Sequence, residues 1–138
     1  MGGEPQSVSR DFPGTLEAAS EAEAWVMNEA RALGLAPGAE FAINLCLEEL
    51  FLNAVRHGRA NRTKISIRSD SGAVRLEFVD DGVPFDPAAA TARRIRDRRE
   101  DFSIGGYGTG LLQEFSRRIS YSRGDGENRL VLEFDSAG

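Results

Sequence analysis

The sequence predicts a single domain that combines α-helices and β-strands. Its 138 residues suit one domain rather than two, and a hydrophobic content of 41% is enough to build a core. Apolar residues recur at helical spacing over 16–56 and alternate with polar residues over 64–80. We therefore expect a tail over 1–7 and one domain over 8–138.

The first part of the domain is expected to hold one strand and two helices. Residues 8–12 fit a short edge strand that ends at a Pro-Gly turn. Apolar residues at helical intervals then predict an amphipathic helix over 16–33, with Gly34 as its stop. Pro37 opens a longer helix that runs to about Arg56 and ends at Gly58.

The second part is expected to be mostly strands. Alternation over 64–69 and 73–80, around a turn at 70–72, indicates a β-hairpin. No pattern follows until about Ile104, and a loop of that length in a compact domain is typical of a functional or mobile segment. The remaining elements are expected as a helix over about 109–118 and strands near 119–123 and 129–134.

The longer helix carries polar residues on an otherwise apolar side. At about 100° per residue, Glu49 and Asn53 lie about 40° apart, while Glu48 falls on a separate, solvated stripe. Burying a carboxylate and an amide costs a few kcal/mol unless they find partners. Two interpretations are open: the pair lines a wet pocket, or Glu49 pairs with Arg56 on a helix that is covered on several sides.

Asp80 has the parity of the apolar residues in its strand. It is therefore expected to point inward, while Asp81 points outward and Gly82 follows at once. An inward carboxylate beside a glycine can accept a hydrogen bond from an exocyclic amine of a flat ring. The alternative is an ordinary turn, because Asp-Asp-Gly is a common strand exit.

A glycine cluster precedes the helix expected over 109–118. Backbone amides around Gly106, Gly108 and Gly110 can bind phosphate oxygens with help from the helix dipole. Their spacing does not match the dinucleotide-binding fingerprint. Arginines are frequent over 93–99. Such a run is typical of a solvated segment, and beside a phosphate site it can also screen the negative charge of a triphosphate.

Composition excludes several classes of function. The net charge of −5 argues against a duplex-DNA binder. The only lysine, Lys64, has no glycine-rich run before it, so a phosphate-loop lysine is excluded. One cysteine allows no internal disulfide, and no apolar run approaches the roughly 20 residues that span a membrane. The composition fits a cytoplasmic protein.

The order of these motifs resembles a known class. Glu49-x-x-x-Asn53, then Asp80-x-Gly82, then Gly106-x-Gly108-x-Gly110-Leu111 resembles the N, G1 and G2 boxes of Bergerat-fold ATPases. The short length and the runs 53–58 and 80–87 look most like the anti-sigma factor serine kinases. The resemblance covers nearly the whole chain.

The resemblance implies a fold and a site. The fold would be a two-layer α/β sandwich, with a mixed and largely antiparallel sheet packed against helices and ATP on the helical side. Asn53 would ligate Mg²⁺ through its amide oxygen, Asp80 would accept from the adenine amine, and Gly82 would let the ring approach. Glu49 would be the general base, and residues 86–104 an ATP lid. The phosphates would lie against Gly106, Gly108, Thr109, Gly110 and Leu111.

The function implied is that of a partner-switching regulator. It would bind ATP and Mg²⁺, sequester a sigma factor, phosphorylate a serine of an anti-anti-sigma protein of the STAS type, and form a homodimer. The alternatives are a nucleotide-responsive binding module without phosphotransfer, or a detached histidine-kinase catalytic domain. Three segments depart from the family pattern: Pro84 for a second G1 glycine, Phe102-Ser103-Ile104 where some kinases have an arginine, and Glu127-Asn128 for a Gly-Thr pair.

Overall fold

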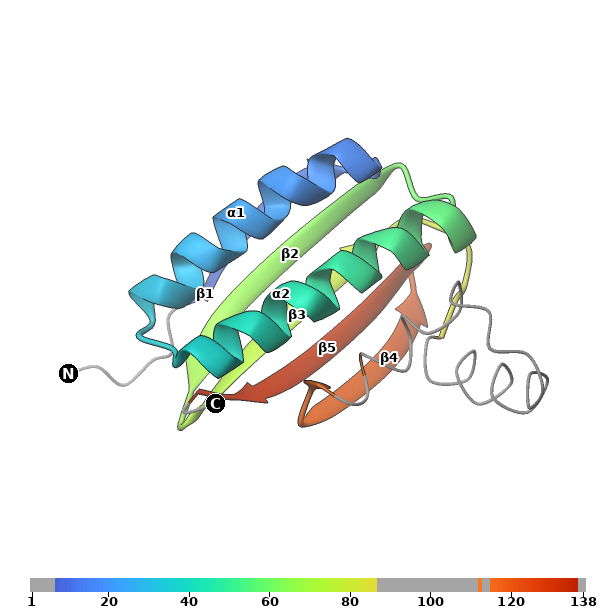
Figure 1. Cartoon of the computed structure of the whole chain (residues 1–138). Helices are drawn as coiled ribbons and strands as arrows, with labels where there is room; N and C mark the ends of the chain where they lie inside the picture. Colours follow the sequence, from blue (N-terminus) through green and yellow to red (C-terminus); the bar gives the residue numbers. More distant parts are fainter. Residues whose placement is uncertain (1–6, 87–111, 113–114, 137–138) are drawn as a thin grey trace, which may run out of the picture.

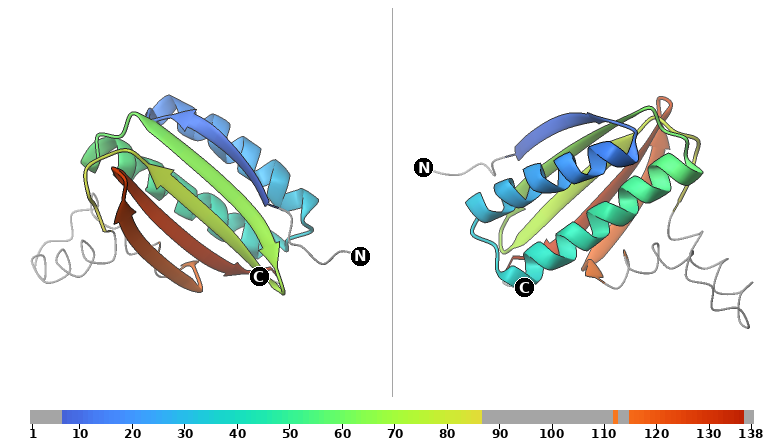
Figure 2. Two further views of the ribbon diagram at one scale, coloured as in Figure 1. Left: turned by 180° about the vertical axis from the view of Figure 1, so that it is seen from behind. Right: turned by 45° about the horizontal axis from the view of Figure 1, so that its top comes forward.

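A layer of two helices covers one face of a five-stranded sheet in the computed structural model of the protein (Figure 1). The structure describes residues 7–86, 112 and 115–136. Viewed from behind, the opposite face of the sheet is covered by none of the described elements (Figure 2). The fold is the expected two-layer sandwich of helices on a sheet.

The sheet has the strand order β1-β2-β3-β5-β4, and each neighbouring pair is antiparallel. Among the described strands the sheet is therefore antiparallel throughout, where a mixed but largely antiparallel sheet was expected. Its strands are β1 (Ser7–Pro13), β2 (Arg62–Asp70), β3 (Ala73–Asp80), β4 (Arg118–Gly124) and β5 (Glu127–Asp135). β1 thus begins at Ser7, the last residue of the expected tail.

Two-residue turns close both hairpins. Ser71 and Gly72 join β2 to β3 with φ of 46° and 84°, and Asp125 and Gly126 join β4 to β5 with φ of 55° and 75°. Positive φ at both central positions is the type I′ geometry, whose twist matches that of the flanking strands. The hairpin expected at 70–72 is confirmed.

Both helices begin where local chemistry predicts, and α1 also ends near the predicted stop. Thr15 caps α1 (Leu16–Ala32), because its side chain accepts a hydrogen bond from the Ala18 N–H at 3.2 Å. Gly34 follows with a φ of 76°, as expected for a helix stop. α2 (Pro37–Leu52) starts with proline in its first turn. Neither helix is long and apolar enough to cross a membrane.

Two expected helix ends differ in the structure. The α-helical pattern of α2 ends at Leu52, and a π-helical turn follows over Asn53–His57, in which the Gly58 N–H donates to the Asn53 carbonyl. Near the other expected helix, Leu112 and Phe115 are helical, but Arg118 is already the first residue of β4. The register of β4 with β5 therefore overrides the helical pattern of the sequence at this point.

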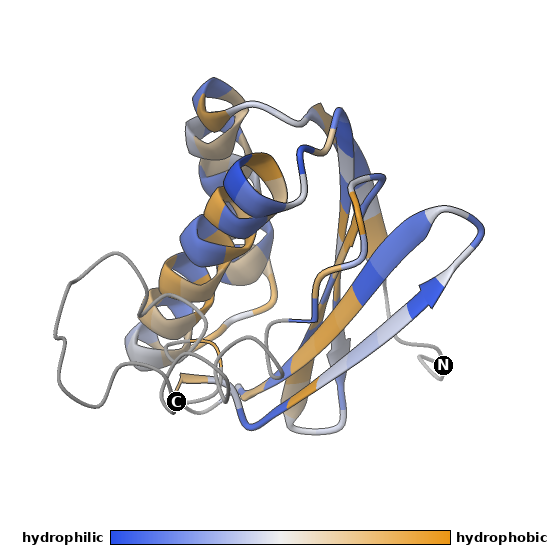
Figure 3. Ribbon diagram, turned by 90° about the vertical axis from the view of Figure 1, so that its right-hand side faces the viewer, coloured by the Kyte–Doolittle hydropathy of each residue, from blue (hydrophilic) through white to orange (hydrophobic). Residues whose placement is uncertain are grey.

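The core lies between the two layers, where the apolar faces of helices and sheet meet (Figure 3). Phe51 of α2 packs edge-on against Phe78 of β3, with ring centroids 5.3 Å apart. Burying such side chains contributes roughly 1.5–3 kcal/mol each. This contact fixes α2 across the middle of the sheet, so the end of α2 and the end of β3 lie at one end of the molecule (Figure 1).

Candidate functional site

A row of buried polar side chains crosses the sheet where three strands begin or end. Thr63 of β2 lies opposite Asp80 of β3, and Asp80 lies opposite Asn128 of β5. All three side chains are buried. The predicted inward direction of Asp80 is confirmed, and the row places a carboxylate between two polar neighbours on the helical side of the sheet.

Asp80 is oriented through one of its two oxygens. Its Oδ1 accepts hydrogen bonds from the Gly82 N–H at 2.8 Å and from Asn128 Nδ2 at 3.0 Å. No described group donates to Oδ2. Burial raises the pKa of Asp80 above its usual value, while the hydrogen bonds from Asn128 and Gly82 oppose that rise. The carboxylate is therefore held in place with one oxygen available to a ligand.

The segment after β3 is packed against the segment after α2. The Val83 N–H donates to the Gly58 carbonyl at 2.8 Å, and a Cβ atom added at Gly82 would overlap that same carbonyl oxygen. The rings of His57 and Phe85 are stacked with their centroids 5.3 Å apart. Gly82 is thus required here by the protein's own backbone, in addition to the ring approach that the resemblance implies.

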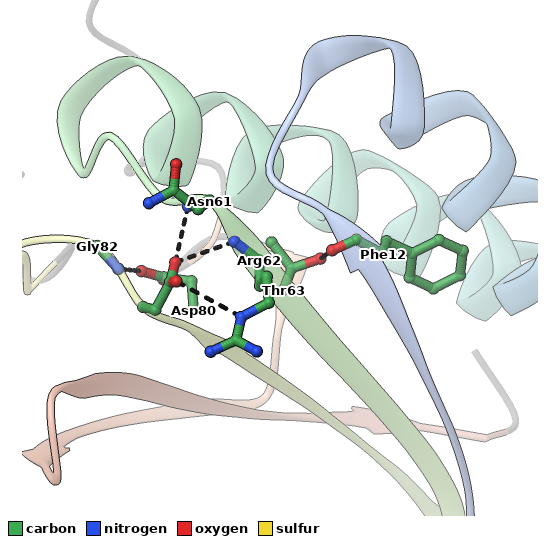
Figure 4. A network of polar contacts seen from close by, with 7 residues as sticks. Phe12, Asn61, Arg62, Thr63, Asp80 and Gly82 are labelled. Carbon is green, nitrogen blue, oxygen red and sulfur yellow. Dashed lines mark hydrogen bonds and ion pairs between the residues drawn. The ribbon is translucent and has the colours of Figure 1, made fainter.

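Asp81 also joins the segment after β3 to the residues that lead from α2 into β2. Its Oδ1 accepts hydrogen bonds from the backbone N–H groups of Asn61 at 2.7 Å and Arg62 at 2.9 Å. Figure 4 shows Asn61 and Arg62 beside Asp80 and Gly82. Desolvation opposes ionisation, but these hydrogen bonds hold the pKa of Asp81 below its usual value. The residue expected to face outward therefore anchors the start of β2.

Asn53 lies in the π-helical turn and is only 8% exposed. Its amide nitrogen Nδ2 is buried, and no residue that the structure describes is its hydrogen-bond partner. Burying an amide group without a hydrogen bond costs free energy, unless a ligand supplies the missing bond. Rotation of the amide exchanges its nitrogen and oxygen, so the group can also present an oxygen, the donor atom that Mg²⁺ prefers. Asn53 therefore fits the role of a metal or phosphate-side ligand.

Glu49 is half-buried one turn before Asn53, whereas Glu48 is exposed, as predicted. Burial raises the pKa of Glu49, the charge of Glu48 acts in the same direction, and Arg56 opposes them. Glu49 makes no ion pair or hydrogen bond with another described residue, so the direct pairing with Arg56 is not formed. A partly desolvated carboxylate with a raised pKa and a free lone pair is suited to accept a proton.

Part of the predicted site lies outside the described residues. This part comprises the phosphate-binding segment with Gly106, Gly108, Thr109, Gly110 and Leu111, the arginines over 93–99, and all but the first residue of the lid expected over 86–104. Their assigned roles stay predictions. The described part brings the N-box turn and the G1 segment together through the Gly58–Val83 hydrogen bond and the His57–Phe85 stack.

Asn128 is the residue whose role the sequence interpretation missed. It was noted only as a departure from a Gly-Thr pair, yet its amide bonds directly to Asp80. Strand parity is the signal that would have found it, because Asn128 continues the inward series of Leu130, Leu132 and Phe134. Thr63 could have been found in the same way.

A family match and a similar known protein point to the same class of domain. Residues 12–134 match the family described as histidine kinase-like ATPase domain. The chain is 32% identical over 101 residues to the serine/threonine-protein kinase BtrW of Bordetella bronchiseptica, covering 70% of this chain and 71% of that protein.

Two solved structures share the fold. One contains the RsbU and RsbW domains of Rv1364c from Mycobacterium tuberculosis, with a TM-score of 0.60 and 16% identity over 96% of this chain. This chain spans only 32% of that one. The other is the SiaB-SiaC complex from Pseudomonas aeruginosa, with a TM-score of 0.57 and 16% identity over 92% of this chain and 88% of that chain. With the site geometry and the family match over 12–134, the chain belongs to the histidine kinase-like ATPase domain family.

Proposed function

We propose that the protein is an ATP-dependent serine kinase of the anti-sigma factor type. It sequesters a sigma factor and phosphorylates a serine on an anti-anti-sigma antagonist of the STAS type. The observation that carries the proposal is a half-buried Glu49 one turn before the buried amide nitrogen of Asn53; within the described part of the chain, Glu49 has no ion pair and that nitrogen has no hydrogen-bond partner. The similarity to BtrW, a serine/threonine-protein kinase, supports phosphotransfer as the reaction.

The residues are assigned as follows. Asp80 accepts a hydrogen bond from the adenine amine, and Asn53 supplies an amide oxygen to Mg²⁺. Bound Mg²⁺ supplies charge neutralisation at the β- and γ-phosphate oxygens. Backbone amides around Gly106, Gly108 and Gly110 hold the phosphates.

Glu49 acts on the substrate hydroxyl. Its carboxylate takes the serine proton while the serine oxygen forms a bond to the γ-phosphorus. The bond from that phosphorus to the β–γ bridging oxygen breaks, and ADP leaves with the electron pair. The raised pKa of Glu49 brings its basicity closer to that needed near neutral pH.

The test is phosphotransfer to the antagonist from labelled ATP, with Glu49→Gln and Glu48→Gln compared. Loss of a general base lowers the rate by roughly 10²–10⁴-fold, so Glu49→Gln should transfer at least about 100-fold more slowly while still binding ATP. Glu48→Gln is the matched control, because it removes the same charge from the exposed neighbouring position. Transfer by Glu49→Gln at the wild-type rate would show that another group is the base.

The alternative is a nucleotide-responsive binding module without phosphotransfer. Phe102-Ser103-Ile104, where some active kinases have an arginine, favours it. A pull-down of the antagonist in ATP and in ADP, followed by phosphopeptide mapping, separates the two functions. Nucleotide-dependent capture without phosphoserine supports the module, whereas phosphoserine on the antagonist supports the kinase.

We also propose that the protein forms a homodimer through β1 and α1. β1 is an edge strand of the sheet, and its Val8 is 38% exposed. Exposed edge strands offer unpaired backbone groups to a second chain, and a charge on the edge blocks such pairing. Sedimentation should give a dimer for the wild type and a monomer for Val8→Lys; a wild-type monomer at micromolar concentration would contradict the proposal.

A further inference from the structure

Asn128 connects four parts of the structure through one buried amide. It is 2% exposed, and its Nδ2 donates to Asp80 Oδ1 at 3.0 Å and to the Val83 carbonyl at 2.8 Å. Its Oδ1 accepts from the Tyr121 hydroxyl at 2.6 Å and from the Phe85 N–H at 3.3 Å. The amide therefore uses both of its donors and accepts two bonds, which is its full capacity.

The orientation of this amide is determined by its backbone partners. The Phe85 N–H can only donate, so it requires the oxygen, and the Val83 carbonyl can only accept, so it requires the nitrogen. If the amide were turned by 180°, its nitrogen would face the Phe85 N–H, which is also a donor, and its oxygen would face the Val83 carbonyl, which is also an acceptor. The second N–H of Asn128 must therefore face Asp80.

Asp80 is left with two unequal oxygens as a result. Oδ1 already accepts from Asn128 and Gly82, while no described group donates to Oδ2. A purine with an amine at position 6, as in adenine, can donate to the remaining oxygen. A purine with a carbonyl at that position would set two acceptors against each other, which costs binding free energy.

We propose that Asn128, held by Tyr121, is a positioning residue that orients Asp80 to select 6-amino-purine over 6-oxo-purine nucleotides. This inference rests on the proposed ATP binding and names the specificity of the same site. Asn128 acts through Asp80 and through the segment Val83–Phe85, which it ties to β5. The hydroxyl of Tyr121 supports Asn128 from β4, so its removal has a smaller effect in the same direction.

The experiment measures dissociation constants for ATP and GTP with the full chain. We expect Asn128→Ala to weaken ATP binding about tenfold and to leave GTP binding nearly unchanged, so that the preference for ATP falls about tenfold. Tyr121→Phe keeps the ring and removes only the hydroxyl, and it should lower the preference about threefold.

A double-mutant cycle separates positioning from a merely structural role. In an Asp80→Asn background, Asn128→Ala should change the ATP preference less than about twofold, because its effect runs through the carboxylate. Thr15→Ala is the control: it removes a stabilising hydrogen bond outside the site, from the Ala18 N–H to Thr15 Oγ1 at 3.2 Å at the start of α1. It should lower the melting temperature and leave the ATP preference unchanged.

Each outcome decides a separate claim. If the wild type binds no ATP, the proposed function itself fails. If the wild type binds ATP and Tyr121→Phe and Asn128→Ala leave the preference for ATP unchanged, Asn128 does not position Asp80. The same conclusion follows if the effect of Asn128→Ala persists in full in the Asp80→Asn background. Tyr121→Phe alone carries the test should Asn128→Ala fail to fold.

Discussion

The end of β3 and the end of α2 differ in how their polar side chains are satisfied. Around Asp80, hydrogen bonds from Asn128 and Gly82 fix the carboxylate, and Tyr121 holds Asn128 in turn. In contrast, the Asn53 amide nitrogen has no partner, and Glu49 has neither an ion pair nor a hydrogen bond among the described residues.

The difference fits the separate roles that are proposed for the two ends, base recognition at Asp80 and phosphate chemistry at Glu49 and Asn53. A group that recognises a flat base gains from being fixed before binding, because a fixed group loses less freedom when the ligand arrives. Groups that serve a metal, a phosphate or a transferred proton must keep bonding capacity for them. We therefore expect substitutions near Asp80 to change stability as well as binding, and substitutions at Asn53 to change mainly function.

Gly82→Ala should have the largest effect on stability. The new Cβ would overlap the Gly58 carbonyl oxygen, so the junction between the two segments must open. Overpacking of this kind should lower the free energy of unfolding by about 3 kcal/mol. Urea unfolding of the variant and the wild type measures this difference. Gly124→Ala is the matched control, because nothing lies within 4 Å of its added Cβ; an equal loss in both variants would contradict the proposed contact.

Asn53→Ala should separate function from stability. Removing an unpaired buried amide should change the free energy of unfolding by less than about 1 kcal/mol. Loss of a metal ligand should weaken ATP binding in the presence of Mg²⁺ roughly 100-fold, or about 2.7 kcal/mol. Calorimetry with and without Mg²⁺ measures this. Unchanged binding in Mg²⁺ would remove Asn53 from the site.

Asp81→Asn should cost about 1 kcal/mol at pH 7, because a charged acceptor of two backbone N–H groups becomes a neutral one. The folded pKa of Asp81 is lowered, so its stabilisation is present above the unfolded pKa of about 4 and is lost as the pH falls through the folded value. The gap between the two proteins should therefore close below about pH 4. Asp135→Asn, at an exposed ion pair with Arg117, should stay within about 0.5 kcal/mol of the wild type.

Asp80→Asn should have the smallest effect on stability and the opposite sign. The folded pKa of Asp80 is raised, so its favourable contribution is fully present below the unfolded pKa of about 4 and is lost as the pH rises through the folded value. An amide cannot ionise and retains that contribution. We expect a gain of about 0.5 kcal/mol at pH 7 that vanishes near pH 3, in thermal unfolding without nucleotide. If Asp80→Asn were less stable than the wild type at pH 7, the surrounding groups would compensate the buried charge of Asp80, and the prediction would be wrong.

Local patterns predicted most of the fold. Strand parity indicated the inward direction of Asp80, and a glycine in a short polar turn indicated the 70–72 hairpin. Helical spacing separated exposed Glu48 from half-buried Glu49. These features depend on backbone periodicity and turn chemistry, which neighbouring residues alone determine.

Only the tertiary structure decided the rest. Asn128 and Asp80 lie 48 residues apart, and the bond between them exists because β5 pairs with β3. The π-helical turn at Asn53, the overlap that requires Gly82 and the two backbone bonds to Asp81 likewise depend on how the segment after α2 meets the segment after β3. The sequence by itself therefore determined the helical and strand periods, the turns and the inward or outward direction of the polar residues, while the packing of distant segments decided how each polar residue is held, because hydrogen bonds and steric overlap act between neighbours in space.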